Sequence, residues 1–342
     1  IDLFSSSSQL LTLLEQPAED IFVNTPNENI KIVAHASKKA IFRVKDNETE
    51  IYSTPDSTIK LDYDLISSTQ GLNHNVEIEV STKDESETLQ FNYFSINSSP
   101  VANPMLDTEP GLTELNDTTL RLKLIAPGKS AAFALTEANN FEISEAAIMT
   151  RSVDGTYFWK DVSVTSEDDW FLYQYIVDGT IKIGDPYSTL ILDPFSDSEI
   201  NNNYFPSYPS NATDFISAHK LGGHSFDWTD SEYEKPQPED LKIYELLLRD
   251  FLESHSYVDL KDTLSYLKNL GINTIELMPV QEFENNDSWG YNPSYHMALD
   301  KYYGDPIQFK AFVNAAHEMG MAVILDVVYN HAFGQSPLSR LY

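Results

Sequence analysis

The chain has 342 residues, which is enough for two or three domains that each bury a core. Its 22 Lys and Arg against 53 Asp and Glu give a formal net charge of −31, which would repel phosphate backbones and anionic membrane surfaces. We therefore predict that nucleic acid is not a partner, and we interpret the acidity mainly as a solvated surface. The absence of cysteine excludes disulfides, thiol nucleophiles and Cys-ligated zinc.

The sequence contains no apolar run of about 18 residues, so we predict no membrane span. The first eight residues lack the basic start and long apolar centre of a signal peptide. Because the sequence does not begin with Met, we expect a trimmed chain and a secreted, periplasmic or cell-surface location. A cytoplasmic location stays open.

Residues 1–99 have a β pattern in which apolar and polar residues alternate between turn-forming residues. This spacing predicts an immunoglobulin-like β-sandwich, for which we expect a spacer or accessory role. The predicted strands are residues 30–34, 40–44, 58–63, 76–80 and 89–93.

A second immunoglobulin-like β-sandwich is predicted for residues 100–200, which begin with a linker that contains Pro100, Pro104 and Pro110. Its clearest strands are residues 120–125, 131–135 and 170–177, with turns at Pro-Gly and Asp-Gly pairs. Residues 201–240 have few apolar runs and are predicted to be a connector that lies over a surface, anchored by its aromatic side chains.

From residue 241 to 342 the pattern changes to β-α-β-α-β. Apolar strands are predicted at residues 243–248, 272–278 and 322–328, each covered on both faces. The helices are predicted at residues 259–270, with an apolar stripe ending in Leu270, and from an N-cap at Asp305 to Gly320.

The connections in this last part are asymmetric. Each predicted helix turns into the next strand through a single glycine, whereas residues 279–304 separate the second strand from its helix. Long loops after the strands place a working face at their carboxyl ends, as in a (β/α)8 TIM barrel. A dinucleotide-binding fold would need a Gly-rich turn after the first strand, and this sequence lacks it. We therefore predict the first β-α-β-α-β units of a TIM barrel, which three strands cannot close.

Candidate functional residues lie in two places. The long loop contains Trp289-Gly-Tyr291, and the third strand runs into Asp326-Val-Val-Tyr-Asn330-His331. Sugar rings have flat C–H faces, so a sugar site needs aromatic faces framed by groups that bond hydroxyls. The structural alternatives are loop packing for the aromatics, and capping or backbone contacts for the polar residues.

The sequence from Asp326 to His331 resembles the first sequence block of the α-amylase family, glycoside hydrolase family 13. Residues 150–155, 158–159, 173–179 and 185–188 resemble the carbohydrate-binding family 48 module, the isoamylase N-terminal domain, which commonly precedes such a barrel. The module resemblance lacks the family's Gly and Trp around residues 135–141, which counts against glucan binding there. Trp159 and Trp170 are either stacking platforms or packing residues.

The resemblance implies an enzyme that acts with retention on α-1,4-glucans such as starch, glycogen or maltooligosaccharides. It implies that Tyr291, beside Trp289, stacks on the sugar at the cleavage site and that His331 bonds a hydroxyl of that sugar. It gives Asp326 a supporting role beside the nucleophile. Asn330 stands where many α-amylases place a ligand of structural calcium, although the chemistry requires no cofactor.

Retaining hydrolysis uses two carboxyl groups about 5 Å apart, which the family places after its fourth and fifth strands. Both lie outside these 342 residues, so we expect this chain by itself to be inactive. Glu282, Glu284 and Asp287 are loop carboxylates that we predict to be solvated. Two alternatives stay open: an α-1,6 branching or debranching enzyme of the same family, and a non-catalytic glucan-binding or scaffold protein.

Overall fold

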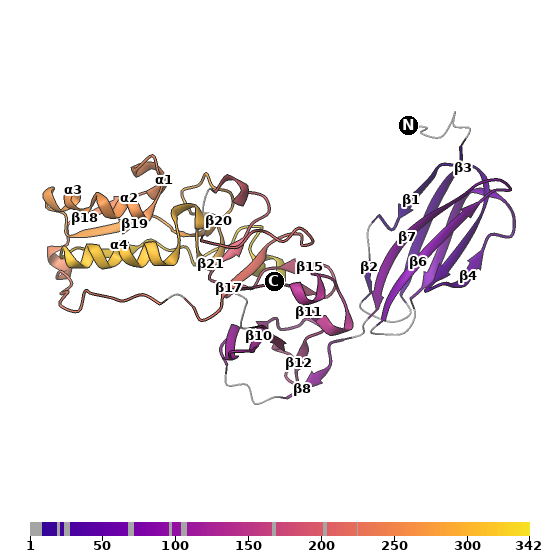
Figure 1. Ribbon diagram of the computed structural model, residues 1–342, viewed down its shortest axis with the longest axis horizontal. Helices are drawn as coiled ribbons and strands as arrows, with labels where there is room; N and C mark the ends of the chain where they lie inside the picture. The colour runs from indigo at the N-terminus through magenta and orange to yellow at the C-terminus, as the bar shows by residue number, and fades with distance from the viewer. Residues whose placement is uncertain are drawn as a thin grey trace.

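The computed structural model describes residues 9–18, 21–23, 28–67, 72–95, 98–103, 108–165, 169–200, 204–223 and 225–342. Pro104 of the predicted linker and residues 201–203 of the predicted connector lie outside these ranges. Figure 1 shows three parts along the long axis of the molecule: an N-terminal β unit (9–95), a central β unit (98–220) and an α/β unit (243–342).

The N-terminal β unit is organised by one long strand, β3. The first half of β3 pairs with β1 and β5, and its second half pairs with β4 and β6, with an irregular register between His35 and Ala40. Two separate strands were predicted here, and that prediction is wrong because the chain bends at the irregularity without leaving the strand. The strands are β1 (Thr12–Gln16), β2 (Ile21–Val23), β3 (Asn29–Asp46), β4 (Thr49–Ser53), β5 (Thr58–Ile66), β6 (Leu72–Ser81) and β7 (Ser86–Ser95).

The central β unit consists of two sheets around one apolar core. Alternate residues of β10 and β14 face this core, as their period-two pattern requires. One sheet has the order β8-β12-β13-β10-β9 and the other β11-β14-β17-β16, with β15 beside β14. The strands are β8 (Val101–Ala102), β9 (Gly111–Asn116), β10 (Thr119–Ile125), β11 (Ala132–Thr136), β12 (Thr150–Ser152), β13 (Tyr157–Ser163), β14 (Trp170–Val177), β15 (Ile181–Ile183), β16 (Ile191–Leu192) and β17 (Ile216–Lys220).

The predicted connector contributes β17 to this second sheet, where it pairs with β14 and β16. The prediction of a segment without a strand is therefore wrong for residues 216–220. Anchoring by aromatic residues is seen for Phe205 and Tyr208, which pack on the core that holds Ile216.

The α/β unit contains the three parallel strands β18 (Ile243–Leu246), β19 (Thr274–Leu277) and β22 (Ala322–Leu325), in that order. The β-α-β-α-β order is confirmed. The remaining elements are α1 (Leu248–Phe251), α2 (Tyr257–Asp262), α3 (Leu264–Asn269), the hairpin strands β20 (Gln281–Phe283) and β21 (Pro293–Leu299), α4 (Pro306–Glu318) and α5 (Pro337–Leu341). The described ranges also contain five 3-10 turns: η1 (Glu137–Asn139), η2 (Glu145–Ala147), η3 (Asp197–Glu199), η4 (Pro238–Asp240) and η5 (Lys301–Tyr303).

The predicted first helix is divided into α2 and α3 at Thr263. The Thr263 hydroxyl donates to the carbonyl of Leu260 at 2.7 Å, a side-chain bond that competes with regular helix formation. Leu264 and Leu267 of the predicted stripe are buried, but Leu270 is exposed. In α4 the capping box is confirmed by reciprocal bonds between Asp305 and Gln308.

Only the central strand of this sheet is well buried. Leu325 of β22 is 39% exposed and Ile243 of β18 is exposed as well. The apolar strands β18 and β22 therefore lack the cover that their sequences require, and each has a single strand neighbour among the described residues. None of the helices in the described part of the chain combines the length and apolar character that a membrane crossing requires.

Candidate functional site

Tyr291 and Asp326 meet at the carboxyl ends of the parallel strands. The Tyr291 hydroxyl donates to Asp326 Oδ2 at 2.5 Å. Asp326 follows the last residue of β22, and its backbone N–H donates to the carbonyl of Leu277, the last residue of β19, at 2.9 Å. The strand register therefore fixes the position of the Asp326 carboxylate, and the long loop after β19 brings Tyr291 into contact with it.

The pKa of Tyr291 is raised to about 12. The hydrogen bond to Asp326 is the largest cause, followed by burial and by the negative charges of Asp326, Glu245 and Glu276. Glu245 and Glu276 are register partners on β18 and β19. Tyr291 therefore stays protonated at neutral pH and orients the Asp326 carboxylate.

The turn before Tyr291 needs a glycine. Gly290 has φ +86°, and a Cβ there would lie 2.5 Å from the carbonyl oxygen of Pro279. Ser288 Oγ accepts from the Gly290 N–H at 3.0 Å. Trp289 is 59% exposed and Tyr291 38%, so both rings are accessible to a ligand.

His331 joins this pair. Its Nε2 lies 2.8 Å from the carbonyl oxygen of Tyr291, and because a carbonyl only accepts, Nε2 is the donor. His296 Nε2 donates in turn to the His331 carbonyl at 3.2 Å. The structure thus brings together Tyr291, Asp326 and His331, while Asn330 is exposed beside them.

Gln281 and His296 are supporting residues that the sequence analysis missed. Buried Gln281 accepts from the Val328 N–H at 3.2 Å and donates to the His296 carbonyl at 2.8 Å. It therefore ties the segment after β22 to the β20–β21 hairpin. A glutamine directly after the apolar Met-Pro-Val of residues 278–280 was the available signal.

The three loop carboxylates differ from one another. The prediction that Glu282 is solvated is wrong: it is buried and accepts from Lys301 Nζ at 2.8 Å. Glu284 is half-buried and accepts from the Gln335 N–H at 2.7 Å. Asp287 is exposed and pairs with Arg249 at 2.7 Å.

A calcium ion needs roughly six or more oxygen ligands. Among the described residues, no group of three or more His, Asp or Glu side chains could hold a metal ion. The role of Asn330 as a calcium ligand therefore stays a prediction, and we derive no chemical step through a metal.

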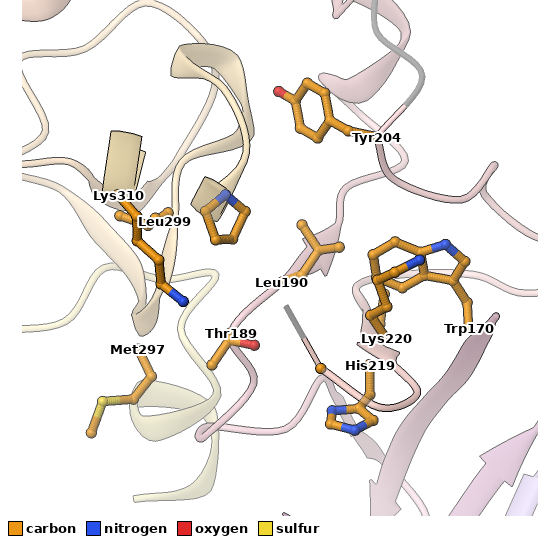
Figure 2. A pocket seen from close by; sticks show the side chains of 12 residues that line it. Trp170, Thr189, Leu190, Tyr204, His219, Lys220, Met297, Leu299 and Lys310 are labelled. Carbon is orange, nitrogen blue, oxygen red and sulfur yellow. The ribbon is translucent and has the colours of Figure 1, made fainter. Parts of the chain in front are cut away.

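A separate cavity of about 340 Å³ lies between the central β unit and the α/β unit. Figure 2 shows Trp170, Lys220 and His219 on one side of it and Met297, Leu299 and Lys310 on the other. The Lys220 ammonium lies 5.0 Å from the centroid of the Trp170 ring, and Arg121 lies 5.4 Å from that of Trp159. In both tryptophans a cation covers a face, which supports the packing alternative for these residues.

The sequence model of the α-amylase catalytic domain matches residues 258–336. Over these residues the chain is similar to the catalytic domain of the α-amylase family. The matched range holds Tyr291, Asp326 and His331, so the family match and the geometry concern the same residues.

Two curated relatives illustrate the range of similarity. A malto-oligosyltrehalose trehalohydrolase of Saccharolobus solfataricus is 36% identical over 151 residues, covering 44% of this chain and 26% of the relative. A 1,4-alpha-glucan branching enzyme of Pseudoalteromonas atlantica is 28% identical and covers 57% of this chain and 29% of the relative. The chain therefore spans less than a third of the length of either relative.

A crystal structure of pullulanase from Anoxybacillus sp. LM18-11 aligns with a TM-score of 0.50 and 21% identity. The alignment covers 94% of this chain and 50% of the pullulanase chain, and it shows a shared fold.

Proposed function

We propose that this chain supplies part of the sugar-binding site of a glycosidase that acts with retention on α-1,4-glucans. The observation that carries the proposal is the Tyr291–Asp326 bond of 2.5 Å with His331 beside it, at the carboxyl ends of parallel strands. These residues come from two loops that are distant in the sequence and meet where α/β barrels place their chemistry.

Each residue has a distinct role in this proposal. The Tyr291 ring offers a flat apolar face for a sugar, and its hydroxyl holds the Asp326 carboxylate in one orientation. Asp326 places a negative charge near the positive charge that develops on the sugar ring in an oxocarbenium-like transition state. His331 has its Nε2 engaged by Tyr291, which leaves Nδ1 and the ring edge for a sugar hydroxyl.

The proposal includes the larger architecture. We propose that β18, β19 and β22 are the first strands of a (β/α)8 barrel, that the central β unit is a family 48-like module, and that the N-terminal β unit is immunoglobulin-like. The nucleophile and the acid are proposed to lie outside residues 1–342, and the whole protein to be secreted or at a cell surface. The uncovered strand β22 supports the barrel, because a further parallel strand would pair with its open edge.

The test measures binding of maltoheptaose to the 342-residue protein by isothermal titration calorimetry. Tyr291→Ala and His331→Ala should each weaken binding at least about tenfold, which corresponds to about 1.4 kcal/mol. Tyr266→Ala, at an exposed tyrosine on α3, is the matched control and should not change the affinity. Unchanged affinity in both site variants would refute the proposal. Release of reducing ends from soluble starch by this protein would refute the placement of the catalytic carboxyls.

A second candidate is hydrolysis of malto-oligosyltrehalose, because the relative with 36% identity is named for this activity. Comparing release of free trehalose from that substrate with release of reducing ends from starch, in a whole protein that contains this chain, separates the two activities. The branching alternative, which the second relative represents, predicts chain transfer without net release of reducing ends.

A further inference from the structure

The segment that follows His331 leaves the α/β unit and docks on the central β unit. Figure 1 shows the C-terminus beside β15. Leu341 of α5 is 3% exposed and belongs to the core that β10 and β14 enclose. The Tyr342 hydroxyl donates to the carbonyl of Ile125, at the end of β10, at 3.3 Å.

Arg340 connects the two units through a single side chain. Its Nη1 donates to Asp214 Oδ2 at 2.8 Å and to the Lys182 carbonyl at 3.0 Å, both in the central β unit. Its Nε donates to the carbonyl of Gly334 at 3.4 Å, within the loop that carries His331. The guanidinium carbon lies 5.7 Å from the centroid of the Phe215 ring. A planar guanidinium can serve these partners at once, which an ammonium cannot do.

The loop between β22 and α5, residues 326–336, has little burial of its own at its centre. Tyr329 is 71% exposed, and Asn330 and His331 are exposed as well. Such a segment is ordered mainly by what holds its ends, because few apolar contacts offset the entropy of fixing its backbone. The first end is fixed by strand β22 and by the buried Val328, whose N–H donates to Gln281 at 3.2 Å, and the second end is fixed by α5.

Bonds to the β20–β21 hairpin fix the second half of the loop to the α/β unit. The Phe333 N–H donates to the Pro293 carbonyl at 3.0 Å, and the Gln335 N–H donates to Glu284 Oε1 at 2.7 Å. The loop therefore lies between two anchors, the hairpin that carries Tyr291 and the central β unit that holds Arg340.

We propose that Arg340 is a positioning residue, which fastens the loop to the central β unit and thereby holds His331 against Tyr291. The central β unit then helps to shape the site without touching a sugar. The part of this inference that concerns sugar binding rests on the proposed function, whereas the part that concerns loop order does not.

Hydrogen–deuterium exchange of the 342-residue protein tests loop order. In Arg340→Ala the exchange of residues 327–336 should become at least about tenfold faster, while β10 and β14 keep their protection. Arg340→Lys should restore part of the protection, because an ammonium can still pair with Asp214. Arg121→Ala is the matched control, since Arg121 forms a comparable ion pair, with Asp161 at 2.7 Å between β10 and β13; it should leave the loop unchanged.

Unchanged loop exchange in Arg340→Ala would overturn the inference. If Arg340→Ala does not fold, Asp214→Asn gives the same readout: faster exchange confined to the loop supports the inference, and unchanged exchange overturns it. Binding of maltoheptaose separates the inference about loop order from the proposal about sugar binding. Faster loop exchange with weaker binding supports both proposals, and faster exchange with unchanged binding supports the role of Arg340 but refutes the role of the loop in sugar binding.

Discussion

The buried carboxylate of Asp185 makes the stability of the central β unit depend on pH. Asp185 Oδ2 accepts from the hydroxyls of Tyr173 at 3.0 Å and Tyr175 at 3.1 Å. Its Oδ1 accepts from the Tyr187 N–H at 2.8 Å. Burial nevertheless dominates over these donors and raises the pKa of Asp185 from 3.8 to about 6.

The sign and size of the pH dependence follow from the difference between the pKa of Asp185 in the folded protein and its ordinary value. Between pH 4 and 6 the folded protein holds a proton on Asp185 that the unfolded chain has already released, so stability falls as pH rises. Each pKa unit corresponds to about 1.4 kcal/mol, so the change from 3.8 to about 6 amounts to about 3 kcal/mol. This contribution is fully present below pH 4 and is lost above pH 6.

Asp185→Asn removes the titration and keeps the shape of the side chain. We expect the free energy of unfolding of the wild type, relative to this variant, to fall by about 3 kcal/mol between pH 4 and pH 7. Urea unfolding followed by hydrogen exchange in β14 reports on the central β unit alone. Asp117→Asn, at an exposed carboxylate, is the control and should follow the wild type. Parallel stability curves for wild type and Asp185→Asn would refute the reasoning.

Other substitutions test the remaining contacts. Lys301→Met should lower the free energy of unfolding by about 3–5 kcal/mol, because Asp197 and Glu282 would lose a buried cation that lies 2.9 and 2.8 Å away. Urea unfolding measures this loss, with Lys235→Met at an exposed lysine as the control. Gly290→Ala should weaken maltoheptaose binding and lower the free energy of unfolding by about 1–3 kcal/mol, because the φ of +86° and the nearby Pro279 carbonyl oppose a Cβ. Wild-type affinity of this variant in calorimetry would contradict the expected loss of binding.

Local signals in the sequence were sufficient for several elements. The Asp305–Gln308 capping box predicted the start of α4 because both partners lie within one helical turn. The alternation of Leu120, Leu122 and Leu124 predicted the buried face of β10. Asp326 was found because a carboxylate at the end of an apolar run needs a partner, and Tyr291 is that partner.

Features that depend on residues far apart in the chain could not be predicted from local sequence patterns. The β17 strand contains a serine, a histidine and a lysine, and it is a strand because β14 and β16 offer it backbone partners on both sides. The division between α2 and α3 falls at Thr263, whose hydroxyl donates to the Leu260 carbonyl, and the sequence does not indicate which partner that hydroxyl takes. The exposure of β22 could not be read from its apolar sequence, because burial is decided by the neighbours that a strand has.

Glu282 shows how the two units determine the site together. It was interpreted as solvated because it falls outside the family pattern. Its partner Lys301, however, lies nineteen residues along the chain and also pairs with Asp197 of the central β unit. Burial alone would lower the pKa of Lys301, and the charges of Glu282 and Asp197 raise it instead, so the cation persists in the interior. A buried ammonium that both units must satisfy fixes their relative position more strictly than apolar contact does, because a small displacement leaves charges unpaired. The hairpin that carries Tyr291 and the surface on which Arg340 docks then keep a fixed relative position, which the proposed sugar site requires of His331 and Asp326.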